Sequence, residues 1–438
     1  MRGLYSLLMW LAQPLLRAKL ARRGAAEPGY LQAVDERFGR YSVPAEGGFV
    51  WLHAVSLGET RAAAILLRQL RERLPGMRLL LTHGTATGRA EGAQLLRPGD
   101  VQVWQPWDTP GVVRRFLAHF RPRIGVLLET EVWPNLAAVC REQQVPLVLA
   151  NARLSEKSLK RALRLAWLAR PAYRSLAAVW AQTEIGAARL RRLGAPVQAV
   201  LGNLKFDATP DAAQLATGRR WRVKTARPIV LLASSRDGEE AQLLEIIQAF
   251  QRATHDGSAV SATESIADQV QWLIVPRHPQ RFDAVAALIE RHGFSLSRRS
   301  DWGGDAPTPA AVWLGDSLGE MALYYALADV ALLGGSFEPL GGQNLIEAAA
   351  CGCPVLMGPS TFNFAQAARL AEEAGAALRV GTMAQAVETA LVLIEDEPRR
   401  SDMAERGLRF AAQNRGAAAK TAAAVAALLE PRATKLVQ

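Results

Sequence analysis

The chain has 438 residues, of which 50% are hydrophobic and 21% charged, and this balance excludes a disordered chain and indicates a folded one of two domains. Its net charge of +11 arises in the first 208 residues, which hold 30 basic and 15 acidic residues, whereas the rest hold 22 and 26. This asymmetry indicates that the first half meets an anionic partner, either a membrane surface, an acidic ligand or nucleic acid. The alternative is a charge that serves solubility alone.

The N-terminus begins with an apolar segment that predicts contact with a membrane. Residues 4–16 are almost uncharged, and four basic residues follow between positions 17 and 23. The segment is shorter than the roughly 20 residues of a membrane-spanning helix, and basic residues stand where a signal peptide would be cleaved. We therefore expect residues 1–24 to anchor the chain at a membrane surface, with anionic lipid binding the basic cluster. The alternative is a first helix of the core.

Short apolar runs alternate with helical patterns along the rest of the chain, which predicts parallel sheets covered by helices on both faces. The runs expected as strands are residues 49–54, 78–82, 101–104, 124–128, 145–150, 178–181, 197–201, 229–233, 272–275, 311–314, 330–333 and 354–357. We predict an α/β fold of two Rossmann-like, doubly wound domains, residues 25–208 and 229–438, that face one another across a cleft. Residues 209–228 are expected to be the linker, and residues 254–268 and 298–309 surface insertions.

The first apolar run leads into a turn that carries a candidate general base. Ser56, Gly58 and Glu59 follow it directly, and a helix is expected from about Glu59. A carboxylate at a helix start is favoured by the helix dipole, so a purely structural role is one interpretation. Beside a ligand-binding cleft it could instead accept a proton, provided that its surroundings bring its pKa nearer to the working pH.

Further polar residues follow the next strands of the first half. Ligands of such sheets bind at the carboxyl ends of the strands, so these residues are expected to share one rim. Glu129 and Glu131 come after a very apolar run and would share a face if that strand extends to them. The other residues of this rim are Thr85, Thr87, Gly88, Arg153 and Lys205.

In the second half, the run 330–333 enters a glycine-bracketed loop that predicts an anion site. Glycines let a backbone approach a ligand closely, and unpaired amides at a helix start attract phosphate. The expected helix begins at about Gln343, and its first turn would present Asn344 and Glu347 on one face, with Glu347 placed to bind ribose hydroxyls. The alternative is an ordinary glycine-rich turn.

Two other strand ends of the second half add basic residues. Ser234 and Arg236 end one strand, and Arg277 and His278 end another. An arginine there can bind a phosphate with its planar fork, although a surface arginine is the simpler interpretation. The chain has no D-x-D pair and no cluster with metal-ligand spacing, so we expect no metal. Its three cysteines form no C-x-x-C pattern, which predicts a reducing compartment.

Together these motifs resemble the Kdo transferases of lipopolysaccharide synthesis, which move 3-deoxy-D-manno-octulosonic acid (Kdo) from its CMP ester onto a lipid A precursor. The resemblance covers about residues 50–365 and rests on W-L-H-A-V-S-L-G-E, the T-x-T-G turn, E-T-E-V-W-P-N-L, N-A-R-L-S, G-N-L-K-F-D, P-R-H-P and G-G-S-F-E-P-L-G-G-Q-N-L-I-E. It implies a GT-B fold and a metal-independent, inverting transfer without a cofactor, from CMP-Kdo to a phosphorylated precursor such as lipid IVA. It also implies a place on the cytoplasmic side of a Gram-negative inner membrane, with anionic lipid as a partner.

The resemblance assigns roles to residues as well. Glu59 would deprotonate the acceptor hydroxyl, and Glu131 or Glu129 would support the positioning of acceptor or donor, so that Glu59 and Glu131 are the expected catalytic residues. Arg277 would contact the CMP phosphate. The donor-binding residues are then expected to be Ser234, Arg277, His278, Gly335, Ser336, Gly341, Gly342, Asn344 and Glu347. The acceptor-binding residues are expected to be Ser56, Gly58, Thr85, Thr87, Gly88, Arg153 and Lys205. The chain departs from the family at Arg236, where a histidine is usual.

Two other interpretations remain. A GT-B transferase or epimerase that acts on a UDP-sugar would share the fold and would be recognised by release of UDP, or by epimerisation without an acceptor. A basic module for membranes or nucleic acid would account for the charge. However, no recognised nucleic-acid motif occurs, and the basic residues are not interleaved with aromatic residues along strands, so we expect no nucleic-acid partner.

Overall fold

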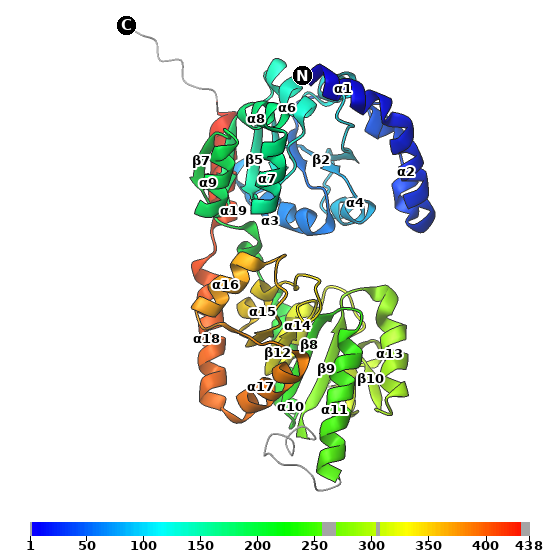
Figure 1. Cartoon of the computed structure of the whole chain (residues 1–438), viewed down its shortest axis with the longest axis vertical. Coiled ribbons are helices and arrows are strands. Elements are labelled where there is room, and N and C mark those ends of the chain that lie inside the picture. Colours follow the sequence, from blue (N-terminus) through cyan, green and yellow to red (C-terminus); the bar gives the residue numbers. More distant parts are fainter. Residues whose placement is uncertain (1, 256–268, 304–306, 431–438) are drawn as a thin grey trace. The chain divides into compact units, whose positions relative to one another are not determined.

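The structure is a computed structural model that describes residues 2–255, 269–303 and 307–430. The chain forms two compact units, one of Met1–Asp207 with Arg415–Gln438 and one of Ala208–Asn414. Each unit is built on a sheet of seven parallel strands (Figure 1). The predicted α/β fold with two Rossmann-like units is therefore confirmed. The surface insertion expected at residues 254–268 lies, from residue 256 onward, outside the described residues. The one expected at residues 298–309 is wrong at its start, where Arg298 ends a strand and Trp302 is buried.

The sheet of the first unit has the strand order β3-β2-β1-β4-β5-β6-β7. These strands are β1 (Val50–His53), β2 (Leu79–His83), β3 (Val101–Trp104), β4 (Ile124–Leu128), β5 (Leu147–Ala152), β6 (Ala178–Ala181) and β7 (Val197–Val200). All seven expected runs are confirmed. The strand order reverses between β1 and β4, so the turns that follow these two strands lie at the switch point where ligands of such sheets bind.

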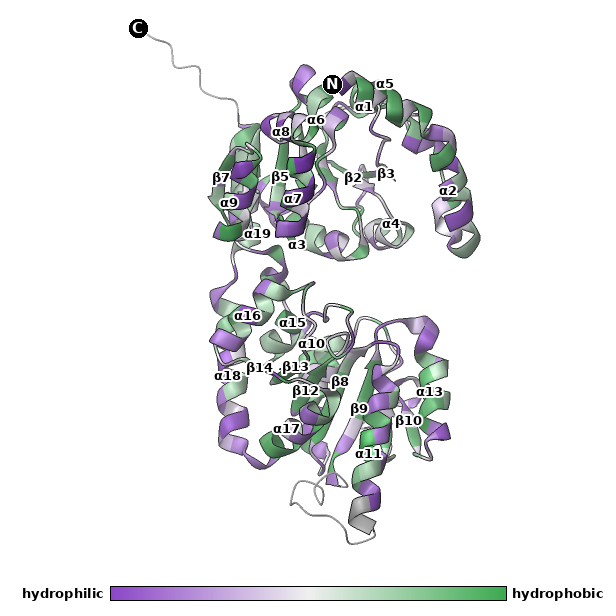
Figure 2. Cartoon of the chain, viewed as in Figure 1, coloured by the Kyte–Doolittle hydropathy of each residue, from purple (hydrophilic) through white to green (hydrophobic). Residues whose placement is uncertain are grey.

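The central strands of this sheet are buried on both faces, which is why they are largely apolar (Figure 2). Trp51 and Leu127 belong to the core on one face, whereas Leu52 and Val126 belong to the core on the other. The first face is covered by α5 (Pro110–Phe120), α6 (Pro134–Glu142), α7 (Glu156–Arg164), α8 (Ala166–Arg174) and α9 (Glu184–Arg192). The second is covered by α3 (Leu57–Arg73) and α19 (Ala417–Leu429).

The sheet of the second unit has the order β10-β11-β9-β8-β12-β13-β14 and reverses between β8 and β12. Its strands are β8 (Ile229–Ser235), β9 (Gln271–Pro276), β10 (Leu296–Arg298), β11 (Val312–Leu314), β12 (Val330–Leu333), β13 (Val355–Met357) and β14 (Ala377–Arg379). Its helices are α10 (Ala212–Lys224), α11 (Glu239–His255), α13 (Phe282–Arg291), α14 (Met321–Leu327), α15 (Leu345–Cys351), α16 (Ala365–Glu373), α17 (Met383–Glu395) and α18 (Glu397–Gln413). The sequence did not predict β10 and β14, which have three residues each and form the sheet edges.

The segment expected as a linker, residues 209–228, is instead largely helical. It contains α10, which packs against α14. Gly218 allows this close approach, because a Cβ atom there would lie 2.4 Å from the carbonyl oxygen of Leu323. Trp221 of the same helix is buried at 2% exposure and packs edge-on against Trp302. The prediction of a linker was wrong because α10 has little amphipathic pattern and its burial depends on these distant partners.

The second predicted domain, residues 229–438, is also corrected at its C-terminal end. The chain leaves the second unit after Asn414, and α19 packs against α3 in the first unit. The carboxylate of Asp207 accepts hydrogen bonds from the amides of Gly416 and Ala418, the latter at 2.7 Å, and so fixes the start of α19. The first unit is therefore completed by the last segment of the chain.

The N-terminal segment forms two short helices, α1 (Arg2–Leu11) and α2 (Gln13–Ala26). None of the residues of α1 is buried, so the interpretation as a core helix was wrong. Two polar side chains attach α1 to the first unit, since Tyr5 donates to Asp108 and Ser6 to Asn135, each at 2.9 Å. Among the described helices, none combines the length and apolar character needed to cross a membrane. The anchor at residues 1–24 stays a prediction.

Candidate active site

The carboxyl ends of the central strands carry an unusual backbone. Glu129 follows β4 with φ of 60°, Asn151 lies near the end of β5 with φ of 51°, and Ser234 lies near the end of β8 with φ of 56°. The pairing register also shifts at these points of β5 and β8. Positive φ is unfavourable for residues other than glycine and is retained where the surroundings enforce it, often at functional sites. The other three such residues in the described chain lie at helix ends, where this conformation is common.

Glu59 stands in the first turn of α3, directly after β1, and takes part in a capping box. The hydroxyl of Ser56 accepts a hydrogen bond from the amide of Glu59 at 3.4 Å, and the carboxylate of Glu59 accepts one from the amide of Val55 at 2.8 Å. Thr85 supports the same turn, because its hydroxyl donates to the carbonyl oxygen of Val55 at 2.9 Å. The turn that presents Glu59 is therefore fixed from both sides.

The surroundings of Glu59 bring its proton affinity into the range of a general base. Burial raises the pKa of Glu59 to about 7; the hydrogen bond from Val55 opposes this rise, and the negative charges of Glu129 and Glu131 add to it. A carboxylate that titrates near neutral pH can both accept and release a proton. The structural and catalytic interpretations of Glu59 are therefore compatible, because a carboxylate that caps α3 can also titrate near neutral pH.

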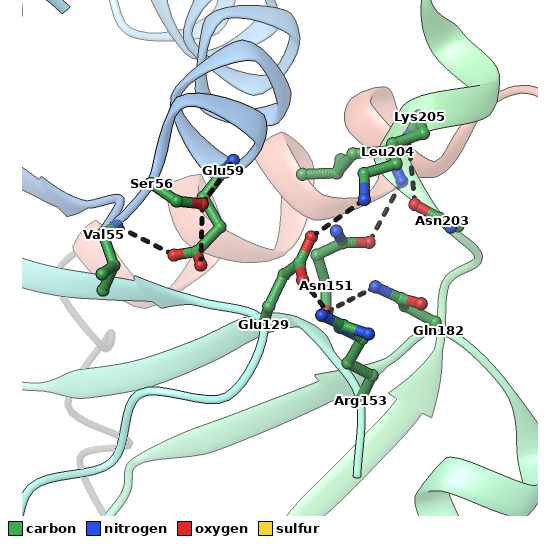
Figure 3. Close-up of polar contacts among 10 residues, drawn as sticks. All are labelled: Val55, Ser56, Glu59, Glu129, Asn151, Arg153, Gln182, Asn203, Leu204 and Lys205. Atoms are coloured by element: carbon green, nitrogen blue, oxygen red, sulfur yellow. Dashed lines mark hydrogen bonds and ion pairs between the residues drawn. The ribbon is translucent and has the colours of Figure 1, made fainter. Parts of the chain in front are cut away.

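Glu129 is a buried carboxylate with two cationic partners (Figure 3). It is 3% exposed, and its side chain lies 2.6 Å from Nε of Arg153 and 3.4 Å from Nζ of Lys205. Because β4 ends at Leu128 and Glu129 takes positive φ, the expected alternation that would place Glu129 and Glu131 on one face of a strand does not hold. Glu129 fixes Arg153 and Lys205, while Glu131 remains half-buried, with a pKa that burial raises.

The loop that carries Lys205 is held by residues that the sequence did not single out. The side-chain oxygen of Asn151 accepts a hydrogen bond from the amide of Leu204 at 3.1 Å, and Gln182 donates to the backbone oxygen of Asn151 at 2.9 Å. Both residues are buried polar side chains, a placement that usually requires satisfied hydrogen bonds. Asn151 precedes Arg153 by two positions, so the N-A-R-L-S motif is the signal that could have found it.

The other residues predicted for the first unit divide into supporting and exposed ones. Thr85 caps α4 (Ala86–Ala93) by accepting from the amide of Gly88 at 3.2 Å. Gly88 is buried, and a Cβ atom there would lie 3.0 Å from the carbonyl oxygen of Val55, so a larger residue would fit tightly. Gly58 and Thr87 are exposed. Thr85 and Gly88 thus shape the turn that holds Glu59.

In the second unit, one carboxylate organises the glycine loop. Glu239, in the first turn of α11, is 0% exposed and accepts hydrogen bonds from the amides of Arg236 at 2.8 Å, Gly335 at 2.7 Å and Phe337 at 3.2 Å. Gly342 donates its amide to the oxygen of Gly335 at 2.7 Å. These loop amides are therefore bonded within the protein, and the sequence does not show which distant carboxylate reaches them; the prediction of unpaired amides concerned the helix start near Gln343 and stays a prediction.

Ser336 has a structural place in the same loop. It is 0% exposed, its hydroxyl donates to the backbone oxygen of Leu333, and the hydroxyl accepts from the amide of Gly358 at 2.8 Å. Both bonds tie β12 to the end of β13, so the hydroxyl is not presented to a ligand as predicted. Gly335, Gly341 and Gly342 take φ of 69°, 87° and 70°, a region that other residues disfavour, and this agrees with the expected need for glycine.

Basic side chains gather at the ends of β8 and β9. Partial burial lowers the pKa of His278, and the positive charges of Arg236, Arg277 and Arg281 lower it further, which shows that the four side chains lie close together. Arg281 is held by the buried Glu240 at 2.6 Å. The sequence-predicted pair Arg277 and His278 is therefore joined by Arg236, the residue at which the chain departs from the family pattern.

The remaining predicted donor residues lie on α15 and β8. The helix begins at Leu345, two residues later than expected, and the side-chain oxygen of its N-cap, Asn344, accepts from the amide of Ile346 at 3.2 Å. Glu347 is half-buried in the first turn, and Ser234 is half-buried at the end of β8. Within the described ranges, no three His, Cys, Asp or Glu side chains meet as they would around a metal ion.

Two parallel-sheet units of this topology, each with polar groups at its switch point, define the GT-B fold class. A solved structure of a glycosyltransferase from Rickettsia africae supports the fold, with a TM-score of 0.56 over 87% of this chain and 99% of that chain. Its sequence identity is 12%, so the likeness concerns the fold alone.

Sequence comparison then gives the family. A profile described as 3-deoxy-D-manno-octulosonic-acid transferase (kdotransferase) matches residues 32–208. The 3-deoxy-D-manno-octulosonic acid transferase of Bordetella pertussis is 46% identical over 96% of this chain and 97% of its own length. That of Haemophilus influenzae is 32% identical over 95% of this chain and 96% of its own. The chain belongs to the Kdo transferase family, and the resemblance found in its motifs is confirmed.

Proposed function

We propose that the enzyme transfers Kdo from CMP-Kdo to a hydroxyl of a phosphorylated lipid A precursor, with inversion of configuration and without a metal or a cofactor. The observation that carries the proposal is Glu59, a half-buried carboxylate whose pKa is raised by burial to about 7 at the switch point of the basic unit. Membership of the family supports Kdo as the transferred sugar.

In the proposed reaction, the acceptor hydroxyl oxygen attacks the anomeric carbon of Kdo while Glu59 takes the hydroxyl proton. The bond between that carbon and the phosphate oxygen breaks in the same step, and its electrons leave with CMP. Attack from the opposite side of the leaving group inverts the configuration. The developing negative charge on the phosphate requires positive partners, which Arg236 and Arg277 supply, while His278, whose pKa is lowered, can donate a hydrogen bond as a neutral ring.

The cations around Glu129 have a proposed role toward the substrates. Arg153 and Lys205 bring two positive charges to one carboxylate, which leaves a net charge of one in favour of an anion. The side chain of Arg153 remains 51% exposed. We assign this pair to the binding of a negatively charged group of the acceptor, with Glu129 and the Asn151–Gln182 contacts holding the two cations in place.

The first helix supports a location on the cytoplasmic side of the inner membrane. The apolar side chains of α1 that remain exposed are Leu4, Leu7, Leu8, Trp10 and Leu11. Basic residues between positions 17 and 23 follow this apolar surface and suit an anionic lipid headgroup layer. A lipid acceptor would then be reached in the membrane that holds the enzyme.

Incubation of the full chain with CMP-Kdo, generated in situ, and a tetraacylated bisphosphorylated lipid A precursor in detergent tests the proposal. The expected result is a product heavier by one or more Kdo units, with matching release of CMP and no loss of rate when EDTA is added. A verified donor that gives no product would overturn the assignment of donor or acceptor. Loss of activity with EDTA would overturn metal independence alone.

A further inference from the structure

A groove of about 740 Å³ runs between α6 and α8 of the first unit, outside the residues assigned so far. Its apolar lining comes from Pro134 and Ala138 of α6 and from Trp167, Leu168 and Pro171 of α8. Trp167 is 38% exposed, so part of its ring is accessible to a ligand in the groove. The volume falls in the range of sites that enclose a small-molecule ligand.

The same groove is basic. Arg141 of α6, Arg174 of α8 and Arg2 of α1 line it, together with the single acidic residue Glu142. Glu142 pairs with Arg2 at 2.7 Å and also with Arg114, outside the groove, at 3.3 Å. In the part of the chain that the structure describes, neither Arg141 nor Arg174 forms an ion pair. Apolar walls with two such arginines suit a ligand that is apolar over most of its surface and carries a phosphate.

The groove extends from the neighbourhood of the acidic residues to the apolar helix α1. At one side, Pro134 begins α6 only three positions after Glu131. Burial raises the pKa of Tyr173 on α8 to about 12, and the negative charge of Glu131 adds to this, so α8 passes close to Glu131. At the other side, Arg2 leads into the exposed apolar surface of α1.

We propose that this groove is a binding site for the acceptor, in which Arg141 and Arg174 bind a phosphate of the glycolipid and Trp167 lies against an acyl chain. The inference rests on the proposed function, because it gives the phosphorylated acceptor a place in the first unit. A bilayer phospholipid has the same chemistry. The position of the groove beside Glu131 favours the substrate, since a bound glycolipid there would have its sugar hydroxyls near the acidic residues.

The test compares a double variant, Arg141→Ala with Arg174→Ala, with a matched control, Arg191→Ala with Arg192→Ala. The control removes two exposed arginines of α9 that do not line the groove. For each full-length protein, the KM for the tetraacylated bisphosphorylated precursor, the KM for CMP-Kdo and the kcat are measured in detergent. Binding of the precursor without donor is measured separately by calorimetry, and binding to phosphatidylglycerol vesicles by flotation.

The expected result is a rise of about tenfold or more in the precursor KM of the groove variant, with its donor KM and kcat within twofold of the unchanged protein. Calorimetry should show the same loss of affinity, and a dephosphorylated precursor should no longer distinguish the variant from the unchanged protein. The control should behave as the unchanged protein in every assay.

Other outcomes separate the groove from the proposed function. If Kdo is transferred but the groove variant keeps its precursor KM and affinity, the groove assignment is overturned and the function stands. If the variant loses only vesicle binding, the groove holds a bilayer lipid and the proposal is likewise overturned. If the unchanged protein binds the precursor through these arginines but gives no product, the groove stands and the proposed reaction fails.

Discussion

Replacement of Glu59 by glutamine separates its proposed catalytic role from its capping role. Glutamine keeps the size of the side chain and one oxygen acceptor, but it cannot take a proton. We expect Glu59→Gln to lower kcat/KM for Kdo transfer by about 10²–10⁴-fold, the usual contribution of a positioned general base. If Glu59 were only a helix cap, the variant would keep its turnover and lose some stability.

The pKa of Glu59 also predicts an unusual effect on stability. Its value of about 7 in the folded chain exceeds the ordinary 4.5, so the folded state holds this proton more tightly than the unfolded state. The associated stabilisation is complete below pH 4.5 and is lost as the pH rises through 7. A shift of about 2.5 units corresponds to roughly 3 kcal/mol, as an upper value because Glu59 keeps some contact with solvent.

The glutamine variant has no such titration, and this gives the sign of the change at each pH. At pH 5 it should be less stable by about 1 kcal/mol, because its single oxygen cannot serve both Val55 and Ser56. At pH 8 it should be more stable by about 2 kcal/mol, because the buried charge has been removed. Urea unfolding at the two pH values measures both differences.

One control variant serves both the turnover assay and the stability assay of Glu59→Gln, and each assay has an outcome that would refute the reasoning. Glu184→Gln changes an exposed glutamate in the first turn of α9 and should alter neither stability nor turnover by a measurable amount. For the unchanged enzyme, kcat/KM should fall about tenfold per pH unit below pH 6 and level off above pH 8, since protonated Glu59 cannot act as a base. A profile that is flat from pH 5.5 to 8.5, or full turnover by Glu59→Gln, would refute the reasoning.

Three further changes test the supports of the site. Glu239→Ala releases the amides of Gly335 and Phe337. We therefore expect the KM for CMP-Kdo to rise about tenfold and the acceptor KM to stay unchanged. Equal changes in the two KM values would contradict a role of Glu239 confined to the glycine loop. Glu129→Ala leaves the cations of Arg153 and Lys205 without their buried partner. We expect it to lower the free energy of unfolding, measured with urea, by about 2 kcal/mol. An unchanged free energy of unfolding would argue against a buried ion pair. A chain that ends at Asn414 lacks α19 and should lose cooperative unfolding of the first unit in calorimetry, while the second unit keeps its transition.

The sequence predicted the sheets well because the central strands are buried on both faces and read as apolar runs, whereas the partly exposed edge strands β10 and β14 were not predicted. A central strand can be recognised from its own residues, without knowing which strands lie beside it, as Ile124–Leu128 illustrates. The course of the chain after Asn414 could not be predicted in this way. The alanine-rich sequence of α19 indicates a helix, but its place in the first unit depends on Asp207 and α3, which lie far away in the sequence.

For the candidate site, the motifs predicted the positions of the polar residues better than their hydrogen-bond partners. Glu59, Glu129 and Arg277 lie where they were predicted, just after the carboxyl ends of their strands. The contacts of these residues could not be predicted, because a buried polar group needs a hydrogen-bond partner that the local sequence does not reveal. Ser336 shows this, since its hydroxyl is used by Leu333 and Gly358 instead of a ligand.

The two units place a glutamate at matching positions and use it in opposite ways. Glu59 and Glu239 both stand in the first turn of the helix that follows the strand at a switch point, and burial raises the pKa of both. Glu239 is fully buried and accepts from three amides, so none of its chemistry is open to a substrate. Glu59 accepts from a single amide and remains partly exposed. Hydrogen bonding therefore commits Glu239 to holding the glycine loop. It leaves Glu59 able to take a proton.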